Sequence, residues 1–305
     1  MARRTVTLTF GEQAENHRGM EKLGAGLAES GFTIEDLKDI QTRFEEHQVK
    51  CELVRLDQVF QAGGRIKPSE AAILIARQGV AALLGETGTL QQLENEQFCL
   101  QWDTKALMYG RVVNKHARHN LCFASQGQEP DYGNGKGRVI PLASVPLTSA
   151  VASNLATFFG PKAENPQVEG NFYYDISKCG IGFHGDAERR RIIGVRLGAT
   201  MSLHYQWYLG GSSVGPRIPL SLDGGDVYVM SEKAAGTDWR CSSFPTLRHA
   251  AGCDKFLRLE KTRSMTGKRR SSSFPTLRHA AGCDKFLRLE KTRSMTGKRK
   301  STEAA

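Results

Sequence analysis

The spacing of hydrophobic and polar residues changes about one third of the way along the chain. Before that point, residues 5–10 and 49–56 alternate like strands, whereas Glu21–Ser30 and the segment after Thr33 have helical spacing, with Thr33 as N-cap. Alternating strands and helices predict a small α/β module at residues 1–96. No chemical motif stands out in this module.

A polar run, Gly11–His17, directly follows the first predicted strand. Loops after strands often carry ligand-binding residues. Nothing in the run itself indicates a ligand, so the sequence favours an ordinary surface loop.

From about residue 97, short hydrophobic stretches are separated by Gly, Pro, Asn and Asp. Short strands with such punctuation predict an antiparallel barrel or sandwich. One helix is expected near residues 147–159. The overall class predicted is α+β, mainly β, with this second domain spanning residues 97–269. The candidate strands are 121–124, 170–176, 191–197, 199–208 and 225–230.

The C-terminal part contains an exact repeat, because residues 242–269 recur at 272–299. Two copies do not form a solenoid, which needs more units to bury its faces. Identity without drift indicates a recent duplication or an error in the gene model. Residues 270–305 are therefore predicted to be a basic, poorly ordered appendage.

Composition narrows the class of protein. With 39% hydrophobic and 24% charged residues, the chain can bury a core, and it contains no long apolar run that would span a membrane. Its seven cysteines lack CxxC spacing, which argues against a disulfide framework and against a cysteine-based zinc site. An intracellular, reducing compartment, the nucleus or the cytoplasm, is expected.

The formal net charge of +10 is concentrated after residue 255. A basic tail of this kind is either simply solvated or makes a salt-dependent contact with nucleic acid. Composition alone leaves both readings open.

One constellation points to metal chemistry. His184 and Asp186 are two residues apart, so on a strand both side chains face the same side. With a second histidine from a distant strand they would give two imidazoles and one carboxylate, the donor set of non-haem Fe(II) oxygenases. His249 is the candidate third ligand, and His279 is its duplicate in the repeat.

The surrounding motifs make the resemblance specific. "HGDAERR", "RIIGVRLG", "GDVYVMSEKAAGTDW" and "LRHAAG" follow one another in the order seen in AlkB-like 2-oxoglutarate and Fe(II)-dependent dioxygenases. The similarity covers about residues 105–263. It implies a double-stranded β-helix (jelly roll) that holds Fe(II) through His184, Asp186 and His249 and uses 2-oxoglutarate and molecular oxygen.

The resemblance also implies residues that bind 2-oxoglutarate. The family places two arginines on the strand after the distal histidine, and Arg258 is the best match, with Arg263 as the second candidate at a spacing that departs from the family pattern. An upstream Asn-x-Tyr that contacts the co-substrate corresponds to Asn171 and Tyr173.

The segment from Met108 to Asn120 is similar to the lid of the family, which meets a flipped base or the nucleic-acid backbone. Arg111, Lys115, Arg118 and Tyr132 are the candidate substrate contacts. The function implied is oxidative demethylation of alkylated DNA or RNA bases, as in DNA repair. The alternatives are a hydroxylase or demethylase of a protein or small molecule, and a catalytically degenerate nucleic-acid-binding module. The oligomeric state stays open.

Overall fold

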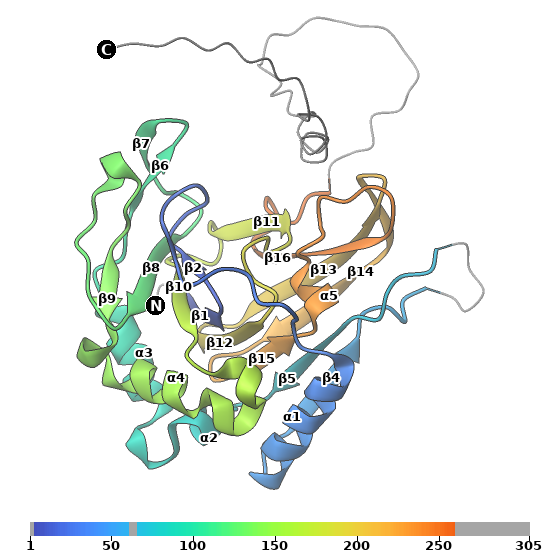
Figure 1. The fold of residues 1–305 in the computed structure, drawn as a ribbon, viewed down its shortest axis with the longest axis horizontal. Helices are drawn as coiled ribbons and strands as arrows, with labels where there is room; N and C mark the ends of the chain where they lie inside the picture. Colours follow the sequence, from blue (N-terminus) through green and yellow to red (C-terminus); the bar gives the residue numbers. More distant parts are fainter. Residues whose placement is uncertain (1–2, 61–65, 260–305) are drawn as a thin grey trace, which may run out of the picture. The chain divides into compact units, whose positions relative to one another are not determined.

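The centre of the fold is a sheet in which the first strand of the chain is an interior strand (Figure 1). The structure is a computed structural model that describes residues 3–60 and 66–259. An eight-stranded sheet has the order β4-β5-β15-β12-β1-β10-β8-β9, and a four-stranded sheet has the order β11-β16-β13-β14. The described part of the protein is therefore mainly β.

The described strands are β1 (Thr5–Gly11), β2 (Ala14–Glu15), β3 (Lys22–Leu23), β4 (Cys51–Arg55), β5 (Ala72–Ala76), β6 (Lys105–Met108), β7 (Arg111–Asn114), β8 (His119–Ala124), β9 (Val139–Pro141), β10 (Gln167–Tyr173), β11 (Gly180–His184), β12 (Ile192–Gly198), β13 (Met201–Leu209), β14 (Ser212–Leu222), β15 (Val227–Met230) and β16 (Thr246–Gly252). The α-helices are α1 (Ile34–Glu46), α2 (Val80–Leu84), α3 (Leu90–Phe98), α4 (Pro146–Phe159) and α5 (Glu232–Ala235).

Alternation along the strands builds two hydrophobic cores on opposite faces of the large sheet. On β5, Leu74 belongs to the core that includes residues of α1, α2 and α4, whereas Ile73 and Ile75 belong to the core shared with the four-stranded sheet. Trp207 of β13 is fully buried in this second core. The fold thus has a helical layer, the large sheet and the small sheet in succession.

Strand β1 is antiparallel to β10 on one side and to β12 on the other. Val6, Leu8 and Phe10 are fully buried in the helix-side core. The alternate residues of β1 are threonines, and Thr7 and Thr9 line a cavity between the sheets. One face of β1 therefore packs under the helices, and the other presents threonine hydroxyl groups to the cavity.

The prediction of a separate module at residues 1–96 was wrong for the described residues. Strands β1, β4 and β5 belong to the same sheet as β8, β10, β12 and β15. The described residues between Met1 and Thr262 belong to one compact unit. The boundary was misplaced because strand pairing between residues far apart in sequence leaves no local signal. The segment 270–305 lies outside the described residues.

Most predicted elements after residue 97 are confirmed within a few residues, including the helix that became α4. The predicted N-cap at Thr33 is also confirmed, since Thr33 and Asp36 form a capping box at the start of α1. The helix expected at Glu21–Ser30 was wrong. Gly24 and Gly26 have φ angles of 102° and 126°, which a right-handed helix cannot contain.

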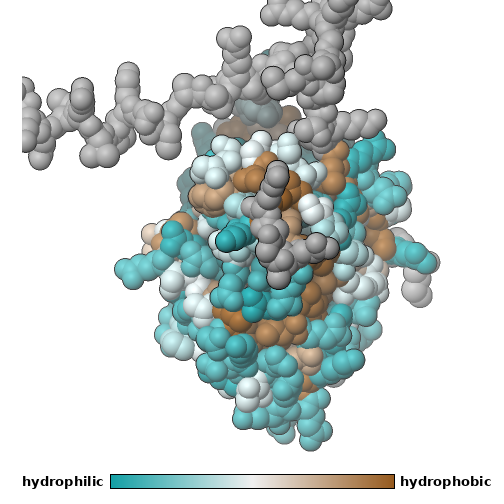
Figure 2. Space-filling model, turned by 90° about the vertical axis from the view of Figure 1, so that its right-hand side faces the viewer, coloured by the Kyte–Doolittle hydropathy of each residue, from teal (hydrophilic) through white to brown (hydrophobic). Residues whose placement is uncertain are grey.

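The side of the molecule that carries β4 and β14 has hydrophobic patches within a mainly hydrophilic surface (Figure 2). Partly buried hydrophobic residues of β14, such as Ile218 and Leu220, pack against the inter-sheet core. None of the described helices is long and apolar enough to cross a membrane.

The interior position of β1 generates a stability prediction. Leu8→Ala should lower the free energy of unfolding by about 2–5 kcal/mol, because it leaves a cavity in a fully buried site. The matched control is Leu27→Ala, whose side chain is 44% exposed, with an expected change below about 0.5 kcal/mol. Urea unfolding measures both. Equal stabilities of the two variants would contradict the placement of β1.

Candidate metal centre and cavity

A cavity of about 750 Å³ lies between the two sheets. One wall consists of side chains from every second position of the central strands, and the opposite wall comes from the small sheet. This volume falls in the range of small-molecule sites. The large-sheet wall comprises Thr7, Thr9, Glu169, Asn171, Tyr173, Ile192, Arg196, Tyr228 and Met230, and the small-sheet wall includes Ile181, His184, Leu203, His249 and Ala251.

Three potential metal ligands lie close together in the lining of this cavity. The ligand atoms of His184, Asp186 and His249 all lie within 4.8 Å of one another. Oδ1 of Asp186 is 3.4 Å from Nε2 of His184 and 3.8 Å from Nε2 of His249. The sequence prediction that these residues come together is confirmed.

Strand pairing explains this convergence. His184 is directly opposite His249 in the register of β11 and β16, after an irregularity in β11. The chain then passes close to the turn after α5, and the backbone N–H of Asp186 donates to the carbonyl of Ala235 at 3.0 Å. A Cβ at Gly185 would collide with the carbonyl oxygen of Gly236, so the residue between the two ligands must be small.

The charge states of the cluster suit metal binding. Burial would raise the pKa of Asp186, but Arg189 foremost, together with the two histidines, holds that pKa well below its usual range. Burial and the neighbouring His184 lower the pKa of His249 to about 3, against the opposing effect of Asp186. A carboxylate and a neutral imidazole are the forms that bind metal ions.

The donor set fits a divalent transition metal. Two imidazole nitrogens and one carboxylate oxygen are the ligands of facial-triad sites. Ligand atoms bound to one ion at about 2.1 Å lie about 3 Å apart at right angles, so the spacings of 3.4 and 3.8 Å from Oδ1 of Asp186 to the imidazoles would have to contract when a metal ion binds. His184 is further fixed through its Nδ1, 2.8 Å from the carbonyl of Gly182, a contact typical of ligand histidines.

A second feature of the cavity is a buried arginine for which the described residues provide no counter-ion. Arg196 of β12 is 1% exposed, and its Nε and Nη1 atoms have no hydrogen-bond partner among the described residues. Burial of an unpaired charge costs several kcal/mol, so such a group indicates an anionic ligand. Tyr228 faces the same space, and burial raises its pKa to about 12 although Arg196 acts in the opposite direction.

The structure places some of the predicted co-substrate residues at the cavity and others away from it. Asn171 and Tyr173 are buried on β10 and line the cavity. Arg258 is exposed in the segment after β16, is not on a strand and is not among the cavity-lining residues. Its predicted placement on a strand was wrong, because β16 ends at Gly252 and the described residues after it form turns and irregular structure. Arg263 lies outside the described residues.

Of the predicted substrate contacts, some line the cavity and others do not. Arg118 lines the cavity, where its Nε donates to Oδ1 of Asn171 at 2.6 Å. Arg111 is exposed on β7, and the hydroxyl of Tyr132 donates to Asp103 at 2.7 Å, so neither is among the lining residues. The prediction that Lys115 contacts the substrate was wrong, because its ammonium group is held by Asn16 and Asn120 and its side chain does not line the cavity.

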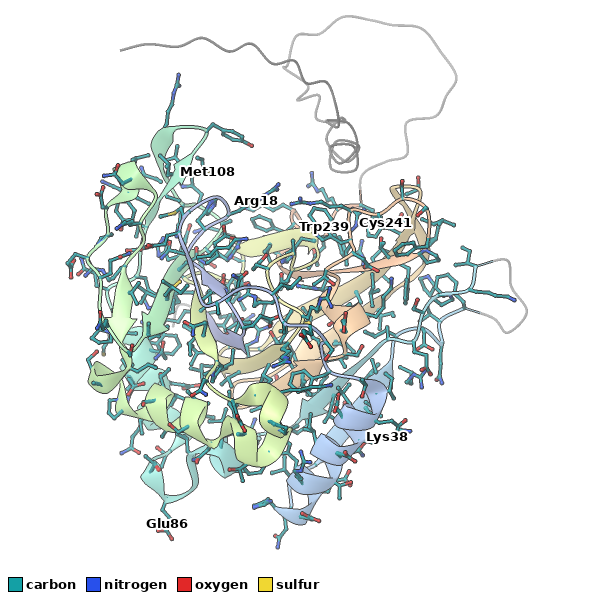
Figure 3. The ribbon with its side chains drawn as sticks, in the orientation of Figure 1. Arg18, Lys38, Glu86, Met108, Trp239 and Cys241 are labelled. Carbon is teal, nitrogen blue, oxygen red and sulfur yellow. The ribbon has the colours of Figure 1, made fainter. Side chains whose placement is uncertain are left out.

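The polar loop after β1 was expected to be an ordinary surface loop, and that expectation was wrong. Glu15, Asn16, His17 and Arg18 line the cavity. Figure 3 shows Arg18 and, from the segment before β16, Trp239 at the top of the view. The signal that could have found the loop was its position after a strand whose alternate residues are polar.

Lys115 provides a pH-dependent prediction. Its ammonium group donates to Oδ1 of Asn16 at 2.6 Å and to Oδ1 of Asn120 at 3.0 Å, while burial lowers its pKa from the ordinary 10.5 to about 8. Lys115→Met should cost about 1–3 kcal/mol, because these oxygens lose their donor. Since the unfolded chain binds this proton more tightly, the stability of the wild type should rise relative to the variant between pH 8 and 10.5.

The control for this experiment is Lys105→Met at an exposed position of β6. Its stability difference from the wild type should stay small at every pH. Chemical unfolding at several pH values measures both differences. A gap for Lys115→Met that narrows with rising pH would contradict the buried ammonium.

Comparison with known proteins adds one relative. No family model matches the chain. The uncharacterized protein R156 of Acanthamoeba polyphaga mimivirus is 44% identical over 254 residues, which cover 83% of this chain and 98% of the viral protein. The aligned span exceeds two thirds of both proteins, and we conclude that the chain belongs to the same family as this viral protein.

Proposed function

We propose that the protein is an Fe(II)- and 2-oxoglutarate-dependent dioxygenase that oxidatively demethylates alkylated nucleic-acid bases. The observation that carries the proposal is the cluster of His184, Asp186 and His249 in a cavity that also contains Arg196, whose Nε and Nη1 have no hydrogen-bond partner among the described residues. Bound Fe(II), with 2-oxoglutarate and oxygen, supplies the oxidising power for hydroxylation of an N-methyl group, after which formaldehyde is lost.

The order of strands supports a double-stranded β-helix. From β10 to β16 the chain passes between the large and the small sheet: β10, β12 and β15 belong to the large sheet, and β11, β13, β14 and β16 to the small one. Two facing sheets connected in this way form a jelly roll. In this interpretation β1, from the opposite end of the sequence, supplies the strand that closes the large sheet.

Arg196 is the residue we assign to the far carboxylate of 2-oxoglutarate. A guanidinium offers paired N–H donors that match a carboxylate, and a buried site strengthens the pair. The arginine expected after the distal histidine is thus replaced by one on β12. Tyr173 and Tyr228 line the same cavity and are suited to orient the co-substrate.

A nucleic-acid base is favoured by the residues around the rest of the cavity. Arg18, Lys22 and Arg240 supply cations, and Trp239 supplies an aromatic ring. The guanidinium of Arg240 lies 5.2 Å from the ring centroid of Trp239. Aromatic and cationic side chains together stack flipped bases and bind phosphates.

A second substrate class is favoured by acidic residues in the same cavity. Burial raises the pKa of Glu15 and of Glu188, and neighbouring carboxylates add to it: Glu188 in the case of Glu15, and Asp186 in the case of Glu188. These groups would stabilise a cationic substrate, which is a property of some alkylated bases and equally of methylated amines in peptides or small molecules. A methylated oligonucleotide and a methylated peptide, assayed side by side for formaldehyde, distinguish the two classes.

The metal assignment predicts the result of an anaerobic titration. Fe(II) and 2-oxoglutarate added to the wild-type protein should produce a visible charge-transfer band and, after oxygen is admitted, succinate. His184→Ala and Asp186→Ala should abolish both signals, because each removes one of three ligands. His204→Ala changes a histidine of the same small sheet that does not line the cavity and should keep them. Undiminished succinate formation by His184→Ala would refute the assignment.

The co-substrate assignment predicts a separate effect of Arg196→Met. The variant should bind 2-oxoglutarate about 10- to 100-fold more weakly, because it loses a buried charge-assisted hydrogen bond. Metal binding should be retained. Titration of the charge-transfer band gives the affinity, and Arg258→Met is the control that should match the wild type. Weak binding by Arg258→Met together with normal binding by Arg196→Met would reverse the assignment.

A further inference from the structure

The two carboxylate oxygens of Asp186 face different partners. Oδ1 faces both imidazoles, at 3.4 and 3.8 Å from their Nε2 atoms. Oδ2 forms an ion pair with Nε of Arg189 at 3.4 Å. Only one oxygen of this ligand is therefore directed at the position where a metal ion would be held.

Arg189 is itself held on two further sides. Its Nη1 donates to Oε2 of Glu169 at 3.0 Å, and its Nη2 donates to Oε1 of Glu188 at 3.0 Å. The side chain is almost completely buried. A buried guanidinium that donates to two carboxylates and forms an ion pair with a third has little freedom to move away from Asp186.

The position of Glu169 is determined in turn by its neighbours. Its Oε1 accepts from Nδ2 of Asn171 at 2.9 Å, and its Oε2 also accepts from the backbone N–H of Glu15 at 3.2 Å. A continuous polar chain thus connects β10, through Arg189, to the metal-binding carboxylate. Such partners of a ligand are known to control its orientation.

We infer that Arg189 is a positioning residue that keeps Oδ2 of Asp186 off the metal ion, so that Asp186 binds through Oδ1 alone. A carboxylate with two free oxygens can bind a metal ion through both of them. Occupation of Oδ2 by Arg189 prevents this and leaves one more coordination position for co-substrate or water. The inference rests on the metal site of the proposed function and adds the residue that sets its coordination mode.

The test counts water molecules on bound Mn(II), which serves as the probe ion, by oxygen-17 magnetic resonance. The wild-type protein, with three protein donors, should keep about three waters. In the double variant Arg189→Met/Glu169→Gln, Oδ2 is released, and about two waters should remain. The paired substitution removes one positive and one negative charge, which limits the destabilisation caused by unpaired buried carboxylates.

Two further variants separate positioning from a general structural effect. Arg190→Met changes the neighbouring arginine, which pairs with Glu232 instead of Asp186, and should keep about three waters. Arg189→Lys keeps the charge without the planar fork, and its Mn(II) affinity should fall about 10- to 100-fold. Thermal unfolding of each metal-free variant verifies that it is folded.

Three waters and unchanged Mn(II) affinity in both Arg189 variants would overturn the role of Arg189 and leave the metal site intact. Absence of Mn(II) binding to the wild-type protein would overturn the metal site and, with it, this inference. If Arg190→Met also lost one water, the inference about Arg189 would be overturned, because the change in water number would then come from disturbance of the whole segment.

Discussion

The insertion of β1 between β10 and β12 is the constraint on which the site depends. It joins the two halves of the large sheet and brings Glu169 and Asn171 of β10 and Arg196 of β12 to one wall of the same cavity. Val6, Leu8 and Phe10 of β1 pack under the helices, while Thr7 and Thr9 line the cavity. A single strand from the start of the chain therefore stabilises the core and shapes the binding wall.

The two buried arginines of this cavity differ in how their charges are compensated. Arg189 forms ion pairs with Glu169, Glu188 and Asp186, so its charge is compensated within the protein. Arg196 also lines the cavity, and its Nε and Nη1 atoms have no hydrogen-bond partner among the described residues. Two buried arginines only seven positions apart thus have different tasks: one orients a metal-binding carboxylate, and the other is available to an anionic ligand.

Local patterns in the sequence were sufficient where the physics is local. The capping box at Thr33 and most strands of the second half could be predicted, because period and capping act over a few residues. The motif that contains His184 and Asp186 was also recognised, but Asp186 lies beyond the end of β11, so the strand period assumed for it was wrong. The pairing of β1 with β10 could not be predicted, because pairing between strands more than 150 residues apart leaves no local pattern in the sequence. Arg196 was overlooked because β12 is hydrophobic on most positions, and only the three-dimensional cavity distinguishes its two faces.

The most direct test of the account is the location of a metal ion and co-substrate by anomalous diffraction from crystals grown anaerobically with Mn(II) and 2-oxoglutarate. We predict an anomalous peak at about 2.0–2.4 Å from Nε2 of His184, Oδ1 of Asp186 and Nε2 of His249. Density for 2-oxoglutarate should extend from this ion to the guanidinium of Arg196. An ion bound elsewhere, or a cavity in which neither ligand is found at saturating concentrations, would contradict the account.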